Sequence, residues 1–207
     1  MTKKQRAETV MTELEKLYPE VPIPLDHKDA YTLMVAVALS AQTTDKKVNQ
    51  VTPKLFAVAD TPEKMAKLEV AEIKELIKEI GLSNSKAKNL KKMAEQLLEK
   101  YNGIVPRTFE ELETLAGVGH KTASVVMSQA FGFPAFPVDT HIHRLMTQWE
   151  LTNGKNVVQT EKDAKAIFPR ERWNKLHLQI IFYGREYSPA RGKGEKDFLT
   201  KMLFDKK

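Results

Sequence analysis

The residues that could do chemistry are concentrated around a short glycine-containing segment, LAGVGHKT, at residues 115–122. Two glycines separated by one apolar residue permit a tight turn with unusual backbone angles, and they leave no side chains to block a close approach. The backbone N–H groups of such a turn, together with the N-terminus of a following helix, can bind phosphate without reading a base sequence. An ordinary turn between two helices explains the same residues, so the segment alone leaves both interpretations open.

Two charged residues near this segment, Lys121 and Asp139, have side chains that could support catalysis. Asp139 stands in the stretch FPVDTHIHR, residues 136–144, at the expected start of a helix. A lysine in the first turn of a helix is usually a solvated charge or a phosphate contact, and aspartate is a favoured N-cap. From the residues alone, these structural roles explain the two positions about as well as catalysis does.

Two histidines of the same stretch, His141 and His143, could suggest a metal site. Residues two apart on a helix point to different sides, so the pair cannot easily bind one ion. We therefore expect no metal there.

The elements that must position these residues are helices. Apolar residues recur at helical spacing along almost the whole chain, whereas the strict alternation of a strand is hard to find, so the sequence predicts an all-α fold. Thr61 before Pro62 predicts a helix start, and Thr108 with Glu111 predicts a capping box. Helices are expected at about 3–18, 29–40, 44–58, 61–68, 70–80, 85–100, 121–131, 139–150, 158–167, 172–187 and 195–205. The narrow polar face of the helix at 29–40 predicts a central place in the core.

Two proline-containing stretches, residues 19–25 and 132–137, are natural boundaries along the chain. They would leave a central domain flanked by both termini. We find no internal repeat and no low-complexity tract.

The composition limits the classes of protein that these elements can form. At 207 residues and 42% hydrophobic content, the chain can bury a proper core. Its net charge of +6 suits a polyanionic partner without identifying one. The absence of cysteine excludes disulfides, thiolate metal sites, cysteine-held iron–sulfur clusters and cysteine nucleophiles. The N-terminus resembles neither a secretion signal nor a transit peptide, and no apolar run approaches the roughly 20 residues that span a bilayer, so we expect a cytoplasmic protein without a membrane partner.

An ordered series of four motifs covers nearly the whole chain: LSAQTTDKKVNQVTP from Leu39, GLSNSKAKNL from Gly81, LAGVGHKTASVV from Leu115 and FPVDTHIHR from Phe136. This series resembles the endonuclease III family of helix-hairpin-helix (HhH-GPD) DNA glycosylases. The resemblance implies an all-α helix-hairpin-helix DNA glycosylase fold, with two helical domains and a DNA-binding cleft between them. It implies a six-helix barrel domain at residues 22–133, with the hairpin at about 108–131, and a second domain from residues 1–21 plus 134–207.

The resemblance also implies a function. A member of this family is a bifunctional DNA glycosylase and abasic-site lyase of base excision repair. We expect it to remove damaged bases, of the oxidised pyrimidine type, from duplex DNA. The expected partner is double-stranded DNA with damaged bases or abasic sites, bound by a monomer that is associated with the nucleoid.

By this resemblance, Lys121 is the nucleophile and Asp139 is its carboxylate partner. An amine that attacks the sugar C1′ displaces the base and leaves an imine, which then permits β-elimination of the 3′ phosphate. The amine must be neutral to attack, so the site has to favour loss of its proton. Asp139 is expected to stabilise positive charge that develops on the sugar and to relay protons.

Further residues are expected to contact DNA. An enzyme of this kind cannot reach C1′ inside a stacked duplex, so the nucleotide must be extruded and the gap filled. The resemblance makes Gln42 and Leu82 the candidates that fill it, and their structural alternatives are a helix-capping glutamine and a core leucine. The other expected contacts are Gly117, Val118, Gly119, His120, Thr122, His141, Arg144, Arg185 and Arg191. A run of four lysines, usually a solvated helix face, could lie near the DNA backbone: Lys86, Lys88, Lys91 and Lys92.

The C-terminal segment departs from the family pattern. Many members carry four cysteines that hold a four-iron cluster, and that spacing falls here on Ser188, Glu195, Phe198 and Phe204. None of these residues supplies a thiolate, so we expect no cofactor. We expect Phe198 and Phe204 to pack inward instead, each contributing roughly 1.5–3 kcal/mol through burial. The basic residues Arg185, Arg191, Lys193 and Lys196 suit a phosphate contact in this segment.

Two alternatives differ in function. Adenine-mismatch glycosylases share the fold but use a glutamate four or five residues before the QT pair, and that position is Val37 here. A specificity for mismatched adenine is therefore less favoured, and a specificity for mismatched thymine stays as a further alternative. A non-catalytic helix-hairpin-helix DNA-binding protein is the alternative from another class, and the presence of both Lys121 and Asp139 argues against it.

Overall fold

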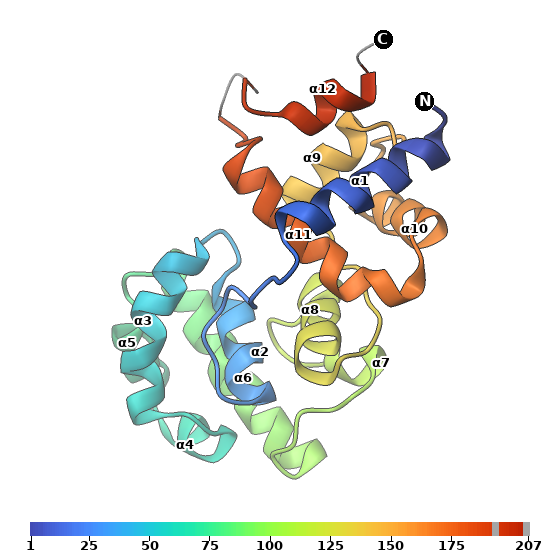
Figure 1. The fold of residues 1–207 in the computed structure, drawn as a ribbon. Helices are drawn as coiled ribbons and strands as arrows, with labels where there is room; N and C mark the ends of the chain where they lie inside the picture. Colours follow the sequence, from blue (N-terminus) through green and yellow to red (C-terminus); the bar gives the residue numbers. More distant parts are fainter. Residues whose placement is uncertain (192–194, 205–207) are drawn as a thin grey trace. The chain divides into compact units, whose positions relative to one another are not determined.

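A computed structural model of the chain describes residues 1–191 and 195–204, and within them the secondary structure is helical with no strand (Figure 1). The prediction of an all-α fold is confirmed. The elements are α1 (Lys3–Leu17), α2 (Ala30–Leu39), α3 (Asp45–Val58), α4 (Pro62–Lys67), α5 (Val70–Leu76), α6 (Ser83–Tyr101), α7 (Phe109–Leu112), α8 (His120–Phe131), α9 (Thr140–Gln148), α10 (Val157–Ile167), a 3-10 turn (Arg170–Arg172), α11 (Trp173–Glu186) and α12 (Phe198–Phe204). No helix among the described residues is both long and apolar enough to cross a membrane.

The chain divides into two compact units with separate hydrophobic cores. The central unit is Ile23–Gly132, and the terminal unit combines Met1–Pro22 with Phe133–Lys207. Their assignment to a barrel domain and a second domain stays a prediction.

Helix α2 lies in the core of the central unit, as its narrow polar face predicts. Eight of its ten residues are buried. Its N-terminus is capped by Asp29, whose Oδ1 accepts a hydrogen bond from the N–H of Thr32 at 2.8 Å. The hydroxyl of Thr32 accepts in return from the N–H of Asp29 at 3.1 Å. These paired bonds satisfy donors that the first turn of a helix otherwise leaves without partners.

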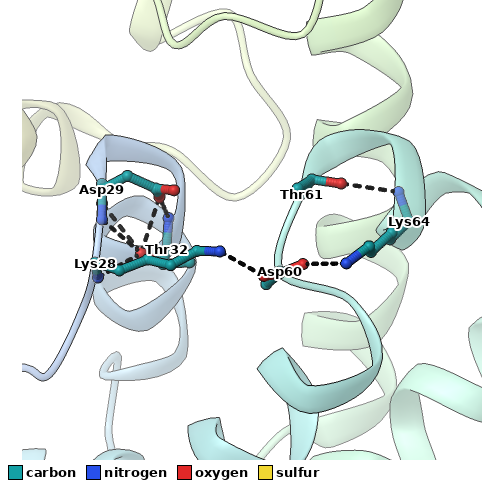
Figure 2. A network of polar contacts seen from close by, with 6 residues as sticks. All are labelled: Lys28, Asp29, Thr32, Asp60, Thr61 and Lys64. Carbon is teal, nitrogen blue, oxygen red and sulfur yellow. Dashed lines mark hydrogen bonds and ion pairs between the residues drawn. The ribbon is translucent and has the colours of Figure 1, made fainter.

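An ion network joins this cap to the start of α4 (Figure 2). The Asp60 carboxylate accepts from the ammonium group of Lys28, and also from that of Lys64 at 2.8 Å. These two ammonium groups hold the pKa of Asp60 well below its usual range. Thr61 caps α4 by accepting from the N–H of Lys64 at 3.3 Å, which confirms the helix start predicted from Thr61 and Pro62.

The terminal unit is held together by contacts between α1 and α11. The side-chain amide of Gln179 donates to the backbone oxygen of Tyr18 and to the Glu15 carboxylate, each at 2.9 Å. Glu15 also accepts from Arg172 at 2.8 Å and from Lys175 at 2.5 Å. The first helix of the chain is therefore an integral part of the C-terminal helical packing.

Two predicted boundaries differ from the structure by three residues or more. The helix expected at 70–80 ends at Leu76, and the chain turns there so that Ile77 and Ile80 both enter the core. The last helix begins at Phe198 because Asp197 accepts from the N–H of Thr200 at 3.1 Å, as an N-cap does. Its predicted end at residue 205 lies outside the described residues.

The capping box expected at the start of α7 is incomplete. Thr108 accepts from the N–H of Glu111 at 3.3 Å, but the Glu111 carboxylate accepts from the Thr108 hydroxyl at 2.7 Å rather than from its backbone.

Candidate active site and DNA-contacting elements

The hairpin turn uses its two glycines in different ways. Gly117 has φ +76°, and a Cβ there would lie 3.1 Å from Cβ of Asn89, so both the backbone angle and the space favour glycine. Gly119 is the N-cap of α8 with an extended backbone, φ −93° and ψ 179°, and a Cβ there would meet nothing within 4 Å. The positive φ angle therefore belongs to Gly117, whereas the absence of a side chain at Gly119 leaves space beside the start of α8.

The turn is fixed to the rest of the central unit by side chains of α6 and α7. Gln96 accepts from the N–H of Ala116 at 2.7 Å and donates to the backbone oxygen of Thr114 at 3.2 Å. His120 contacts the Glu113 carboxylate at 2.7 Å, and its ring stacks on Phe109. Val118 is buried, so any contact that it makes with DNA must come from its backbone.

Lys121 is the second residue of α8 and is exposed. The residue that caps this helix is a glycine, so no side chain caps the N-terminus. Further along α8, the core holds Ala123, Val126 and Met127. The amine at this position therefore belongs to the first turn of a helix that packs into the core, next to the positive end of the helix dipole. Thr122 beside it is half-buried.

Asp139 is the N-cap of α9, as its structural alternative predicts. Its Oδ1 accepts from the N–H of Ile142 at 2.8 Å. A carboxylate has two oxygens and about four acceptor sites, so this bond fixes the direction of the group without using its full capacity.

A buried histidine that belongs to none of the sequence motifs lies within electrostatic range of Asp139. His177 on α11 contacts the backbone oxygen of Trp173 through Nδ1 at 3.0 Å, and its ring edge faces Phe136. Burial lowers its pKa to about 4. Its Nε2 has no hydrogen-bond partner among the described residues. A lone histidine in an apolar helix was the only signal in the sequence.

The remaining candidates of the terminal unit differ in exposure. Arg185 and Arg191 are exposed. His141 lies against Gly184, where a Cβ would approach its Nδ1 to 3.1 Å. Arg144 donates to the Ser188 hydroxyl at 2.9 Å and also to the Ser188 backbone oxygen.

The two neighbouring histidines of α9 point to different elements, as expected. His141 packs on α11, whereas His143 contacts the hydroxyl of Thr160 on α10 at 2.8 Å. Within the described residues, no group of three metal-binding side chains occurs.

Gln42 and Leu82 share a backbone conformation that is uncommon outside glycine. Their φ angles are +57° and +59°, which costs on the order of 1 kcal/mol for each residue. Leu82 is 58% exposed, so its interpretation as a core residue is wrong. Gln42 is also exposed, and α3 is capped by Thr44 rather than by Gln42, so its capping interpretation is wrong too.

The lysine run on α6 is not a uniformly solvated face. Lys86 is only 7% exposed and Lys91 is half-buried, whereas Lys88 and Lys92 are exposed. The Nζ atoms of Lys86 and Lys91 each donate to backbone oxygens at the C-terminus of a neighbouring helix.

The four C-terminal positions on which the expected cluster spacing falls are occupied by side chains that supply no thiolate. Ser188 is buried against Arg144. Glu195 is exposed, and its backbone oxygen accepts from Lys201 at 2.8 Å. Phe198 packs edge-on against Tyr183 with ring centroids 5.7 Å apart. Lys193 lies outside the described residues.

The expectation that Phe204 packs inward is wrong. Its side chain is 40% exposed under the guanidinium of Arg6, which lies 5.5 Å from the ring centroid. Leu199 and Leu203 take the inward positions because residues four apart share one face of a helix.

Comparison with known proteins places this fold and hairpin in one class. Residues 35–170 match the model of the HhH-GPD superfamily of base excision DNA repair proteins. Endonuclease III of Haemophilus influenzae is 44% identical over 191 residues, which are 92% of this chain and 90% of that protein. Endonuclease III of Escherichia coli has the same identity and coverage. A solved structure of a trapped covalent intermediate between endonuclease III and DNA matches with a TM-score of 0.90 and 40% identity, over 93% of this chain and 91% of that one.

The chain therefore belongs to the endonuclease III family within that superfamily. It is a base excision repair enzyme, a DNA glycosylase with abasic-site lyase activity. The predictions of the family, the glycosylase fold and the class of enzyme are confirmed, and the non-catalytic alternative is not supported.

Proposed function

We propose that Lys121 is the nucleophile of this enzyme and that Asp139 is its carboxylate partner. The observation that carries the proposal is the position of Lys121, an exposed amine in the first turn of α8 behind a glycine N-cap. The glycine N-cap and the helix dipole favour a DNA phosphate at this end of α8, which would bring a sugar close to the amine.

The proposed reaction has two stages that share one covalent bond. The neutral amine of Lys121 uses its lone pair to attack C1′, and the base leaves with the electrons of the glycosidic bond and takes up a proton. Opening of the sugar ring and loss of the amine proton give an imine. The imine acidifies the C2′ hydrogen, so its removal expels the 3′ phosphate by β-elimination. Asp139 stabilises the cationic sugar and relays the protons.

Extrusion of the damaged nucleotide is assigned to Gln42 and Leu82. Both side chains are exposed, and both stand on strained backbone of the kind that accumulates at functional sites. The turn Gly117–Gly119, with His120 and Thr122, contacts the phosphates, and His141, Arg144, Arg185 and Arg191 supply contacts from the terminal unit. Oxidised pyrimidines are the proposed substrates, and nucleoid DNA is their proposed location.

We further propose that the enzyme works as a monomer, and that it needs no cofactor because α12 is attached by side chains. The Tyr183 hydroxyl donates to the Asp197 carboxylate and accepts from the N–H of Leu199, and all three residues are buried. Any chemistry assigned here to Lys121 and Asp139 needs no metal.

Borohydride trapping on a duplex with one abasic site tests the proposed nucleophile. Hydride reduces the imine to a stable amine, so the wild-type protein should become covalently attached to DNA. Lys121→Gln should give no adduct, whereas Lys100→Gln, which changes an exposed lysine in the last turn of α6, should give the wild-type yield. An adduct of wild-type yield with Lys121→Gln would overturn the assignment.

Asp139→Asn separates the catalytic role of Asp139 from its structural one. Asparagine is as good an N-cap as aspartate, so α9 should persist while the negative charge is lost. We expect single-turnover base release to slow by about 100-fold or more, with duplex binding unchanged. Unchanged base release would refute the role of the carboxylate.

A further inference from the structure

The left-handed backbone conformations of Gln42 and Leu82 must be stabilised by contacts with other residues. One is in the loop between α2 and α3, and the other is the residue before α6. Left-handed backbone outside glycine persists only where the surroundings determine it. Gln42 has no neighbouring glycine, since it follows Ala41 and precedes Thr43, whereas Leu82 follows Gly81.

A single residue contacts both segments. The Nζ atom of Lys86 donates to the backbone oxygens of Leu39 at 2.9 Å and Ala41 at 2.6 Å, and to the Thr43 hydroxyl at 3.2 Å. These acceptors match the three donors of an ammonium group, and two of them flank Gln42 in the chain. The backbone N–H of the same Lys86 makes the first main-chain hydrogen bond of α6, to the oxygen of Leu82 at 3.0 Å, so its side chain is attached one helical turn after Leu82.

The environment of Lys86 makes this contact costly to break. The residue is only 7% exposed, and desolvation lowers its pKa, so its charge depends on the three acceptors around it. Two of these acceptors are backbone oxygens at or just past the C-terminus of α2, where a helix dipole favours a cation. A displaced loop at 40–43 would leave a buried ammonium group without partners.

We propose that Lys86 is a positioning residue for base extrusion, which holds the loop of Gln42 and the segment of Leu82 in register so that both side chains enter the duplex together. The inference rests on the gap-filling roles proposed above for these two residues. Lys86 touches neither the substrate nor the reacting atoms, so it acts through the two segments that it joins.

Lys91 provides a matched control on the same helix. Its Nζ donates to the backbone oxygens of Ala66 at 2.9 Å and Leu68 at 2.7 Å, at the C-terminus of α4. Lys91→Met therefore removes the same type of lysine-to-carbonyl contact from α6, at a site that does not include Gln42 or Leu82.

The experiment compares two single-turnover rates in Lys86→Met and Lys91→Met. The first is base release from a duplex with one ring-saturated pyrimidine, and the second is strand cleavage at a preformed abasic site. Extrusion costs least where no base has to be unstacked, so a positioning defect should affect base release more strongly. We expect the ratio of base release to strand cleavage to fall at least tenfold in Lys86→Met and to stay within twofold of wild type in Lys91→Met. Equal ratios in the two variants would overturn the inference.

Three further variants keep the result interpretable. Thr43→Val removes one acceptor of Lys86 but keeps the lysine charge. If Lys86→Met does not fold, Thr43→Val must still lower the ratio of base release to strand cleavage at least twofold. An unchanged ratio in Thr43→Val refutes the inference. Gln42→Ala and Leu82→Ala test the underlying roles. A lowered ratio in both, with a wild-type ratio in Lys86→Met, rejects the positioning role alone. Wild-type ratios in both reject the gap-filling roles and the inference with them.

Discussion

The hydroxyl of Tyr183 donates a hydrogen bond of 2.7 Å to Oδ1 of Asp197, and both side chains are buried. The backbone N–H of Leu199 donates to the same hydroxyl at 3.0 Å, so Tyr183 joins α11 to the start of α12. Burial and the hydrogen bond to Asp197 raise the pKa of Tyr183 well above its usual range, so it remains a donor. This contact attaches the last helix in a chain that has no cysteine to do so.

Tyr183→Phe should destabilise the protein because it removes a hydroxyl that serves two buried partners. The Asp197 carboxylate and the Leu199 N–H each lose a bond, and the expected fall in the free energy of unfolding is about 1–3 kcal/mol. Urea unfolding followed by circular dichroism measures it. Tyr31→Phe is the control, because the buried Tyr31 hydroxyl has no partner among the described residues, and it should cost nothing. Equal losses in both variants would argue against the contact.

Phe198 and Phe204 should differ in their contributions to stability. Phe198 packs edge-on against the rings of Tyr183 and Tyr187, at centroid distances of 5.7 Å and 5.4 Å. Phe198→Ala is therefore expected to lower the free energy of unfolding by about 1–2 kcal/mol. Phe204→Ala, at an exposed position, should change it by less than about 0.5 kcal/mol. Thermal unfolding compares the two, and a larger loss for Phe204 would show that α12 packs differently.

Substitution of the two hairpin glycines by alanine should have different effects on stability. Gly117→Ala forces a Cβ into the left-handed region and against Asn89, so we expect a loss of about 1–2 kcal/mol in stability. Gly119→Ala adds a methyl group to open space at an extended residue, so stability should stay within about 0.5 kcal/mol. Duplex binding should nevertheless weaken in Gly119→Ala if this space receives a phosphate. The free energy of unfolding and the affinity for duplex DNA are measured for both variants. Equal stability of the two variants would contradict the requirement for glycine at the left-handed backbone angle of residue 117.

His177 predicts a specific loss of stability in acid. Its pKa is about 4 in the folded chain, below the ordinary value of about 6.5 that an unfolded chain has. The unfolded state therefore binds the extra proton first, so stability is intact above about pH 6.5 and falls as the pH drops towards 4, by up to about 1.4 kcal/mol per pH unit. His177→Gln should reduce the difference in the free energy of unfolding between pH 7 and pH 5. His27→Gln, at an exposed histidine, should leave that difference unchanged, and an equal reduction in both would exclude His177 as its source.

The helices were largely predictable because local signals define them. Thr61 before Pro62 marks the start of α4, and the narrow polar face of residues 29–40 predicts the buried α2. Where tertiary packing decides, the prediction was less accurate. The end of α5 depends on Ile77 and Ile80 both reaching the core, which periodicity alone does not show.

In the candidate site too, features set by local sequence were predictable, whereas features set by tertiary packing were not. The motif around Lys121 predicts the hairpin turn and the exposed first residues of α8, because the spacing of its glycines indicates where the backbone turns. The surroundings of Lys86 and His177 were not predictable, since they include groups distant in sequence. The prediction that Phe204 is buried was wrong because the spacing of cluster ligands does not indicate which face of α12 packs into the core.

Peptide mapping of the trapped adduct identifies the lysine that attacks C1′. Trypsin does not cut at a modified lysine, so an adduct on Lys121 should appear on the uncut peptide of residues 108–144, in which Lys121 is the one lysine. After nuclease digestion, mass spectrometry should find the reduced sugar adduct on that peptide, with loss of the unmodified peptide of residues 108–121. An adduct on any other lysine, with residues 108–121 recovered intact, would contradict the account.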